Sequence, residues 1–154
     1  MPCAPGASAK LGALAAEGTR NRRFEAATGD RATLAFAAVE GYRLLATAQP
    51  RGNADAPLPV ALLDYSGFRY RAGLITSPPL WSEMRLALDF ADGQWRAIAG
   101  DVADAALHSS FAGDLAAMRK ALDRSNAAAA RSAVAAQLDR VDALETYFAQ
   151  HLPK

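Results

Sequence analysis

Alanine is the feature of this sequence that most constrains its fold. The 154 residues include 38 alanines and 18 leucines, but only seven valines and isoleucines together. Alanine and leucine are among the strongest helix formers, whereas all-β proteins depend on β-branched residues. Because 51% of the residues are hydrophobic, the chain also has too much apolar surface for a disordered protein. The composition therefore predicts an all-α protein.

Glycine and proline divide the chain into five helical segments. The main breaks are 49–59, with three prolines, 76–79, 100–101 and 123–126. Between them, apolar residues recur every three or four positions, which is the spacing of one helix face. This pattern predicts helices over 30–45, 58–76, 79–98, 107–122 and 127–148. Asp30 suits the N-cap of the first helix, because its carboxylate can accept hydrogen bonds from free N–H groups.

Each segment has an apolar stripe that we expect to face the core. In the first segment the stripe is Leu34, Ala38, Tyr42 and Leu45. The same helix has a second apolar face, on which Phe36 and Leu44 lie on either side of Glu40. The stripes of the later segments centre on Val60, Leu63, Gly67, Tyr70 and Leu74; on Met84, Leu88, Ala91, Trp95 and Ile98; on Leu107, Phe111, Leu115, Met118 and Leu122; and on Ala130, Val134, Leu138, Val141, Leu144 and Phe148.

Length and connection lengths predict the architecture. A chain of 154 residues forms one domain, and short connections make consecutive helices antiparallel neighbours. We expect an up-and-down antiparallel bundle of four or five main helices, with a further helical segment at the N-terminus. Residues 1–8, rich in proline, alanine and glycine, are predicted to be a flexible tail, and residues 9–152 the bundle domain.

Charge and cysteine content argue against several classes of protein. The net charge is +1, and the only dense basic cluster is Arg20, Arg22 and Arg23, so we expect no nucleic-acid partner. The single cysteine, Cys3, excludes an internal disulfide, a cysteine zinc site and covalent haem attachment. No apolar run is long enough to span a membrane. The Pro/Ala/Gly-rich start resembles that of a mature exported protein, so a periplasmic or exported location is preferred over the cytoplasm.

Five acidic and histidine residues are predicted to share one layer of the bundle. In an antiparallel hairpin, residues equally distant from the turn lie at the same level. Counting from the turns places Asp64 level with Asp92, and His108 level with Asp142. Glu40 falls within about one turn of the level of Asp64. Carboxylates and imidazoles that converge from several helices form the usual metal site of a bundle core. The sequence therefore predicts a divalent or ferric metal site, or a small-ligand site, at Glu40, Asp64, Asp92, His108 and Asp142.

Asp64 has the clearest indication of burial, because Val60 and Phe68 lie at i−4 and i+4. A buried carboxylate requires a cationic or hydrogen-bonding partner. Asp64 is therefore also expected to form an Asp–Arg or Asp–Tyr network, which is a structural alternative to metal binding. The candidate partners are Arg69, Arg71, Tyr42, Tyr65 and Tyr70. The residues predicted to support the polar layer are Tyr42, Tyr70, Arg71 and Trp95.

Catalysis and haem binding have weaker support. There is no G-x-S-x-G motif, no glycine-rich phosphate loop and no pair of Glu-x-x-His motifs. Haem is disfavoured, because Met84 and His108 fall near opposite ends of the bundle. We therefore predict a non-catalytic bundle that binds a metal ion or small ligand. The alternative is an interaction module that dimerises or docks a protein partner through an apolar helix face, and an enzyme with a carboxylate acid/base pair is a third hypothesis.

Overall fold

The computed structural model describes residues 29–49 and 56–151, and every regular element in these ranges is helical. The predicted all-α helical bundle is therefore confirmed. A first helix, called here the outer helix, covers residues 29–48. The other elements are α2 (Leu58–Ala72), α3 (Trp81–Ile98), the short 3-10 helix η2 (Ala99–Asp101), α4 (Ala105–Asp123) and α5 (Ala127–His151). The predicted tail, the N-terminal helical segment and the arginine cluster at 20–23 lie outside the described residues.

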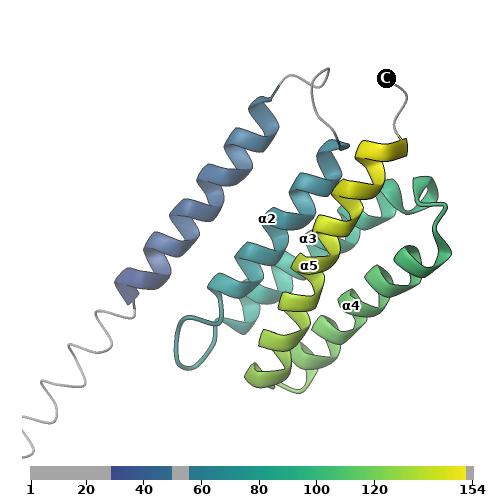
Figure 1. Ribbon diagram of the computed structural model, residues 1–154. Helices are drawn as coiled ribbons and strands as arrows, with labels where there is room; N and C mark the ends of the chain where they lie inside the picture. Colours follow the sequence, from purple (N-terminus) through teal and green to yellow (C-terminus); the bar gives the residue numbers. More distant parts are fainter. Residues whose placement is uncertain (1–28, 50–55, 152–154) are drawn as a thin grey trace, which may run out of the picture.

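Four helices enclose the core. α2 packs on α3 and on α5, and α4 packs on α5 and on α3, so that the four helices form a closed ring (Figure 1). The outer helix runs alongside α2 and extends the ring on one side (Figure 1). The bundle thus has four main helices and a fifth that covers one flank.

The apolar stripes of α2 to α5 point into the core as predicted. Tyr70, Phe111, Leu63, Met84 and Leu88 are fully buried. The hydroxyl of Tyr70 donates a hydrogen bond to the carbonyl of Met118 at 3.1 Å, which gives this buried polar group a partner. Helix spacing identified the core-facing stripes of these four helices, although α2 also buries Tyr65 and Ala72 outside its stripe.

The outer helix differs from its prediction in two ways. Leu34 and Leu45, expected in the core, are each 70% exposed. The helix already includes residue 29, so Asp30 lies within it and is not its N-cap. The charged residues Glu40 and Arg43 instead contact the bundle. The predicted inner stripe is therefore wrong for Leu34, Ala38 and Leu45, and only Tyr42 of that stripe faces the bundle.

A glycine allows α2 and α5 to approach closely. A Cβ atom placed on Gly67 would lie 2.6 Å from Cδ2 of Leu138, and it would also overlap the side-chain oxygen of Gln137. Gln137 is fully buried and donates a hydrogen bond to the carbonyl of Leu63 at 3.2 Å. The α2–α5 contact therefore has no space for a side chain at position 67.

We predict opposite effects for alanine at two helical glycines. Gly67→Ala should lower the free energy of unfolding by about 1–3 kcal/mol, because it overpacks the α2–α5 contact. Gly93→Ala should raise it by roughly 0.5–1 kcal/mol, because an added Cβ meets nothing within 4 Å there and alanine has the higher helix propensity. Urea denaturation of the two variants measures both values. Equal changes in the two variants would contradict the close α2–α5 contact.

Candidate functional site

Asp64 lies where the outer helix, α2 and α5 meet. The Asp64 side chain is half-buried, and the hydroxyl of Tyr42 on the outer helix donates a hydrogen bond to Asp64 Oδ2 at 3.3 Å. The Tyr42 ring packs edge-on against Phe68, with ring centroids 5.6 Å apart. The predicted Asp–Tyr network around Asp64 is therefore present, with Tyr42 as the tyrosine.

The electrostatic environment of Asp64 is acidic. Burial raises the pKa of Asp64 to about 6, and the negative charges of Glu145 and Asp142 on α5 add to the rise. Burial and the Asp64 charge together raise the pKa of Tyr42 to about 12. The pKa of Glu145 is also raised, by partial burial and by Asp142. No cation pairs with Asp64 among the described residues to offset these effects, so its pKa stays above the ordinary value.

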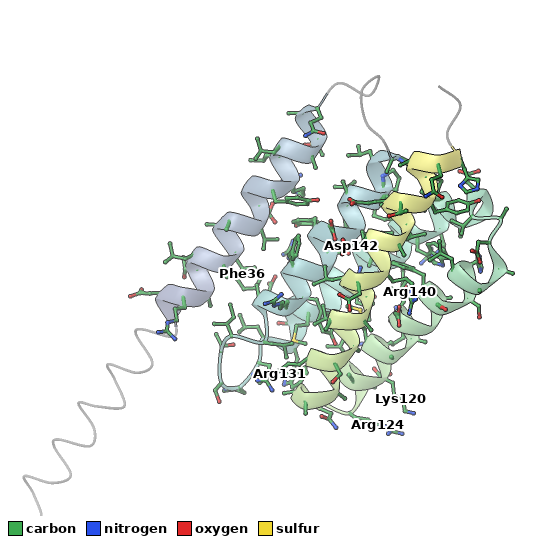
Figure 2. The ribbon with its side chains drawn as sticks, viewed as in Figure 1. Phe36, Lys120, Arg124, Arg131, Arg140 and Asp142 are labelled. Carbon is green, nitrogen blue, oxygen red and sulfur yellow. The ribbon has the colours of Figure 1, made fainter. Side chains whose placement is uncertain are left out.

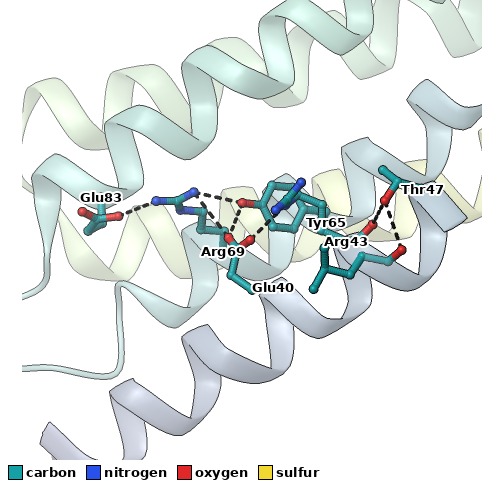
Figure 3. A network of polar contacts seen from close by, with 7 residues as sticks. Glu40, Arg43, Thr47, Tyr65, Arg69 and Glu83 are labelled. Atoms are coloured by element: carbon teal, nitrogen blue, oxygen red, sulfur yellow. Dashed lines mark hydrogen bonds and ion pairs between the residues drawn. The ribbon is translucent and has the colours of Figure 1, made fainter.

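A second polar network joins the outer helix to α2 and α3 (Figure 3). The hydroxyl of Tyr65 donates a hydrogen bond to Glu40 Oε1 at 2.6 Å, and Arg43 Nε donates to Glu40 Oε2 at 2.9 Å. Arg69 donates to the Tyr65 hydroxyl at 2.9 Å and to Glu83 of α3 at 2.8 Å. The hydrogen bonds from Tyr65 and Arg43 lower the pKa of Glu40, so this carboxylate remains charged. The Asp64 and Glu40 networks together bind the inner face of the outer helix to the bundle.

The five residues of the predicted polar layer do not form one ligand set. Glu40 belongs to the Arg69 network, and Asp92 pairs with Arg119 of α4. The His108 ring lies 5.1 Å from the ring of Trp95, and Asp142 is exposed on α5 (Figure 2). Within residues 29–49 and 56–151, no group of three or more His, Cys, Asp or Glu side chains could hold a metal ion.

The physical reason is that equal level along a bundle does not mean equal direction. Counting from a turn gives the height of a residue, but the helix rotates by about 100° per residue, so neighbours in height can face different helices. Asp64 faces the outer helix and α5, whereas Asp92 faces α4. Of the five predicted residues, Asp64 and Asp142 do lie near each other. Their negative charges repel, which raises the pKa of Asp64.

Of the four predicted supporting residues, only Tyr42 contacts Asp64. Tyr70 lies in the core, where its hydroxyl donates a hydrogen bond to the carbonyl of Met118. Arg71 is exposed, and Trp95 packs against Phe111 with ring centroids 4.6 Å apart. Sequence reasoning did not identify Glu145 or Glu83 as members of these networks, and it named Tyr65 as a candidate partner of Asp64 rather than of Glu40. The available signal was their position: Tyr65 directly follows Asp64, and Glu145 lies three residues after Asp142 on the same helix face.

A cavity of about 790 Å³ adjoins the Asp64 site. Tyr42 and Leu45 from the outer helix, Pro59 and Ala61 from α2, and Glu145 from α5 contribute to its walls. Its lining is mostly apolar, with one carboxylate. The cavity thus has the chemistry of a site for a small apolar molecule with a positively charged group.

Comparisons with protein-family models, with curated proteins and with solved structures give no match to this chain. None of the described helices is long and apolar enough to cross a membrane.

Replacing Asp64 by asparagine should change the pH dependence of stability. The pKa of Asp64 is about 6 in the folded protein, above its ordinary value of 3.8. The folded state thus binds the proton more tightly, and stability falls as pH rises from about 4 to 6. Asp64→Asn keeps an acceptor for Tyr42 and removes this loss. At pH 7.5 we expect a stability gain of about 1 kcal/mol, a value discounted for partial solvent screening, and at pH 3.5 no gain.

Chemical denaturation between pH 3.5 and 8 measures this effect, with Asp139→Asn as the matched control on an exposed position of α5. The control should follow the wild-type curve. Parallel curves for wild type and Asp64→Asn would show that Asp64 ionises normally in the folded protein.

Proposed function

We propose that this protein is a non-catalytic interaction module and that the outer helix is its docking element. The observation that carries the proposal is that this helix is apolar on its exposed side, and not only on the side that faces the bundle. Its exposed leucines, Leu34, Leu44 and Leu45, are 70%, 59% and 70% accessible to solvent. Its charged residues Glu40 and Arg43 contact the bundle instead. Single exposed apolar residues are ordinary on protein surfaces, but these three leucines, with the exposed Ala37 and Ala38 between them, make one side of the helix apolar.

The exposed side of the outer helix has no charge along most of its length. Between residues 32 and 48, its exposed residues are Thr33, Leu34, Ala37, Ala38, Leu44, Leu45, Thr47 and Ala48. A surface of this composition favours an apolar partner, because burying it desolvates no charged group. The Glu40 and Asp64 networks hold the opposite face on α2, so the leucines are presented from a supported helix. This arrangement supports recognition of a partner helix, in the manner of helix packing in bundles.

Site-specific photo-crosslinking tests the proposal in cells that express the native chain. A photoreactive amino acid at Leu45 should give a discrete protein adduct, because we expect Leu45 to be covered by a partner. The same amino acid at Arg124, an exposed residue at the α4–α5 turn (Figure 2), serves as the control and should give none. If neither Leu45 nor Leu34 gives an adduct above the level of the control, the outer helix is not a docking element.

A second candidate function is the binding of a small cationic amphiphile, and the cavity beside Tyr42 and Glu145 favours it. We expect octylammonium to raise the melting temperature by roughly 2 °C, whereas octyl sulfate of the same chain length should not. Glu145→Gln should abolish the shift, and Asp139→Asn on the same helix should retain it. Equal shifts with both compounds, or in both variants, would contradict a site that selects for positive charge.

A further inference from the structure

We infer that the partner of the outer helix is the outer helix of a second copy of this chain, packed antiparallel. This inference rests on the proposed function and names its partner. It begins from the spacing of the exposed face. Leu34, Ala38, Gly41, Leu45 and Ala48 follow one another at intervals of four, three, four and three residues. This alternation places them in one line along a helix and is the spacing of a coiled-coil seam.

In the part of this line from Leu34 to Leu45, the sizes of the side chains read the same in both directions. Leu34 and Leu45 are the large residues at the two ends, and Ala38 and Gly41 are the small residues between them. When two copies pack antiparallel about a twofold axis between residues 39 and 40, Leu34 of one copy meets Leu45 of the other, and Ala38 meets Gly41. The leucines then form two apolar layers, and the small residues let the helices approach closely between them.

The surface of the outer helix has space for this approach. A Cβ atom on Gly41 would meet nothing within 4 Å in the single chain, so position 41 faces open space. The glycine is therefore not required by the packing of the chain on itself, in contrast to Gly67. A helix–helix contact with a second copy gives Gly41 a structural role, since close approach of two backbones requires a residue without a large side chain.

Charge favours the antiparallel arrangement over the parallel one. The charged exposed residues of the outer helix, Asp30 and Arg31, lie at its N-terminal end. In a parallel, in-register pair, Asp30 of one chain would lie beside Asp30 of the other, and Arg31 beside Arg31, so that like charges would meet. The antiparallel pair places them beside Ala48 and Gln49 of the other copy, which are uncharged. It also brings the positive end of each helix dipole next to the negative end of the other.

The expected dimer is reversible. The outer helix covers 20 residues and is therefore about 30 Å long. One helix pair of this length lies at the low end of specific interfaces, below about 1,200 Å². Dimer formation should thus depend on protein concentration, and sedimentation equilibrium should detect both monomer and dimer.

Disulfide crosslinking distinguishes the two arrangements. In a Cys3→Ser background, Leu34→Cys and Leu45→Cys chains with different affinity tags are mixed and oxidised. The antiparallel pair predicts a mixed disulfide between the two variants and little product from either variant alone. Disulfides formed mainly between identical variants would indicate the parallel arrangement and would overturn the inference.

Two further variants test the seam itself by sedimentation. Leu34→Glu with Leu45→Glu should weaken association at least tenfold, and Leu86→Glu, at an exposed leucine of α3, should leave it unchanged. Gly41→Leu should also prevent association while retaining the fold, because position 41 has space in the single chain. Circular dichroism and melting temperature check the fold of each variant. Wild-type protein that remains monomeric at all concentrations would overturn the inference.

The mass of the Leu45 photo-adduct separates the two proposals. An adduct of twice the chain mass supports self-association. An adduct of another mass, or a crosslink within a single chain to residues 1–28, overturns self-association. The proposed docking function survives an adduct with a different protein and fails when Leu45 contacts only its own chain.

Discussion

The polar attachment of the outer helix to α2 determines the surface of this protein. Glu40 accepts hydrogen bonds from Tyr65 and Arg43, and Arg69 extends this network to Glu83 of α3. Because α2 presents Phe68 as well as tyrosine and arginine on this flank, the face of the outer helix that meets it carries Tyr42 together with Glu40 and Arg43. Leu34 and Leu45 are consequently left on the outside.

The two sides of α2 therefore have different physical roles. Its apolar side, with Val60, Leu63 and Tyr70, belongs to the four-helix core. Its other side carries Asp64 and Arg69, which contact the outer helix. The core does not depend on the outer helix for its large side chains, since the buried cluster is formed by α2 to α5 and the segments between them. The outer helix is thus an addition to a complete bundle, attached by polar groups and by the contact between the Tyr42 and Phe68 rings.

Asp64 gives this attachment a dependence on pH. Its carboxyl is half-buried between Tyr42 and the carboxylates of α5, so it ionises at a higher pH than an ordinary aspartate, with a pKa of about 6. The Glu40 network has the opposite character, because hydrogen bonds from Tyr65 and Arg43 stabilise the charged carboxylate. Protonation of Asp64 therefore relieves its burial and its repulsion from Glu145 and Asp142, although the hydrogen bond from Tyr42 favours the charged carboxylate. Glu40, in contrast, retains its charge through the neutral range.

The amino-acid sequence determined the fold class, the helices and the core of the bundle. The apolar stripes around Leu63, Leu88, Phe111 and Val141 each lie on one helix face. Because each stripe must be buried against neighbouring helices, few other arrangements of the four helices are possible. It also identified Asp64 as a half-buried carboxylate and a tyrosine as its partner. Only the tertiary structure decided which way the outer helix faces and which polar residues meet. The outer helix has apolar residues on more than one face, and level along a bundle does not specify direction around it, so those contacts depend on how the helices pack.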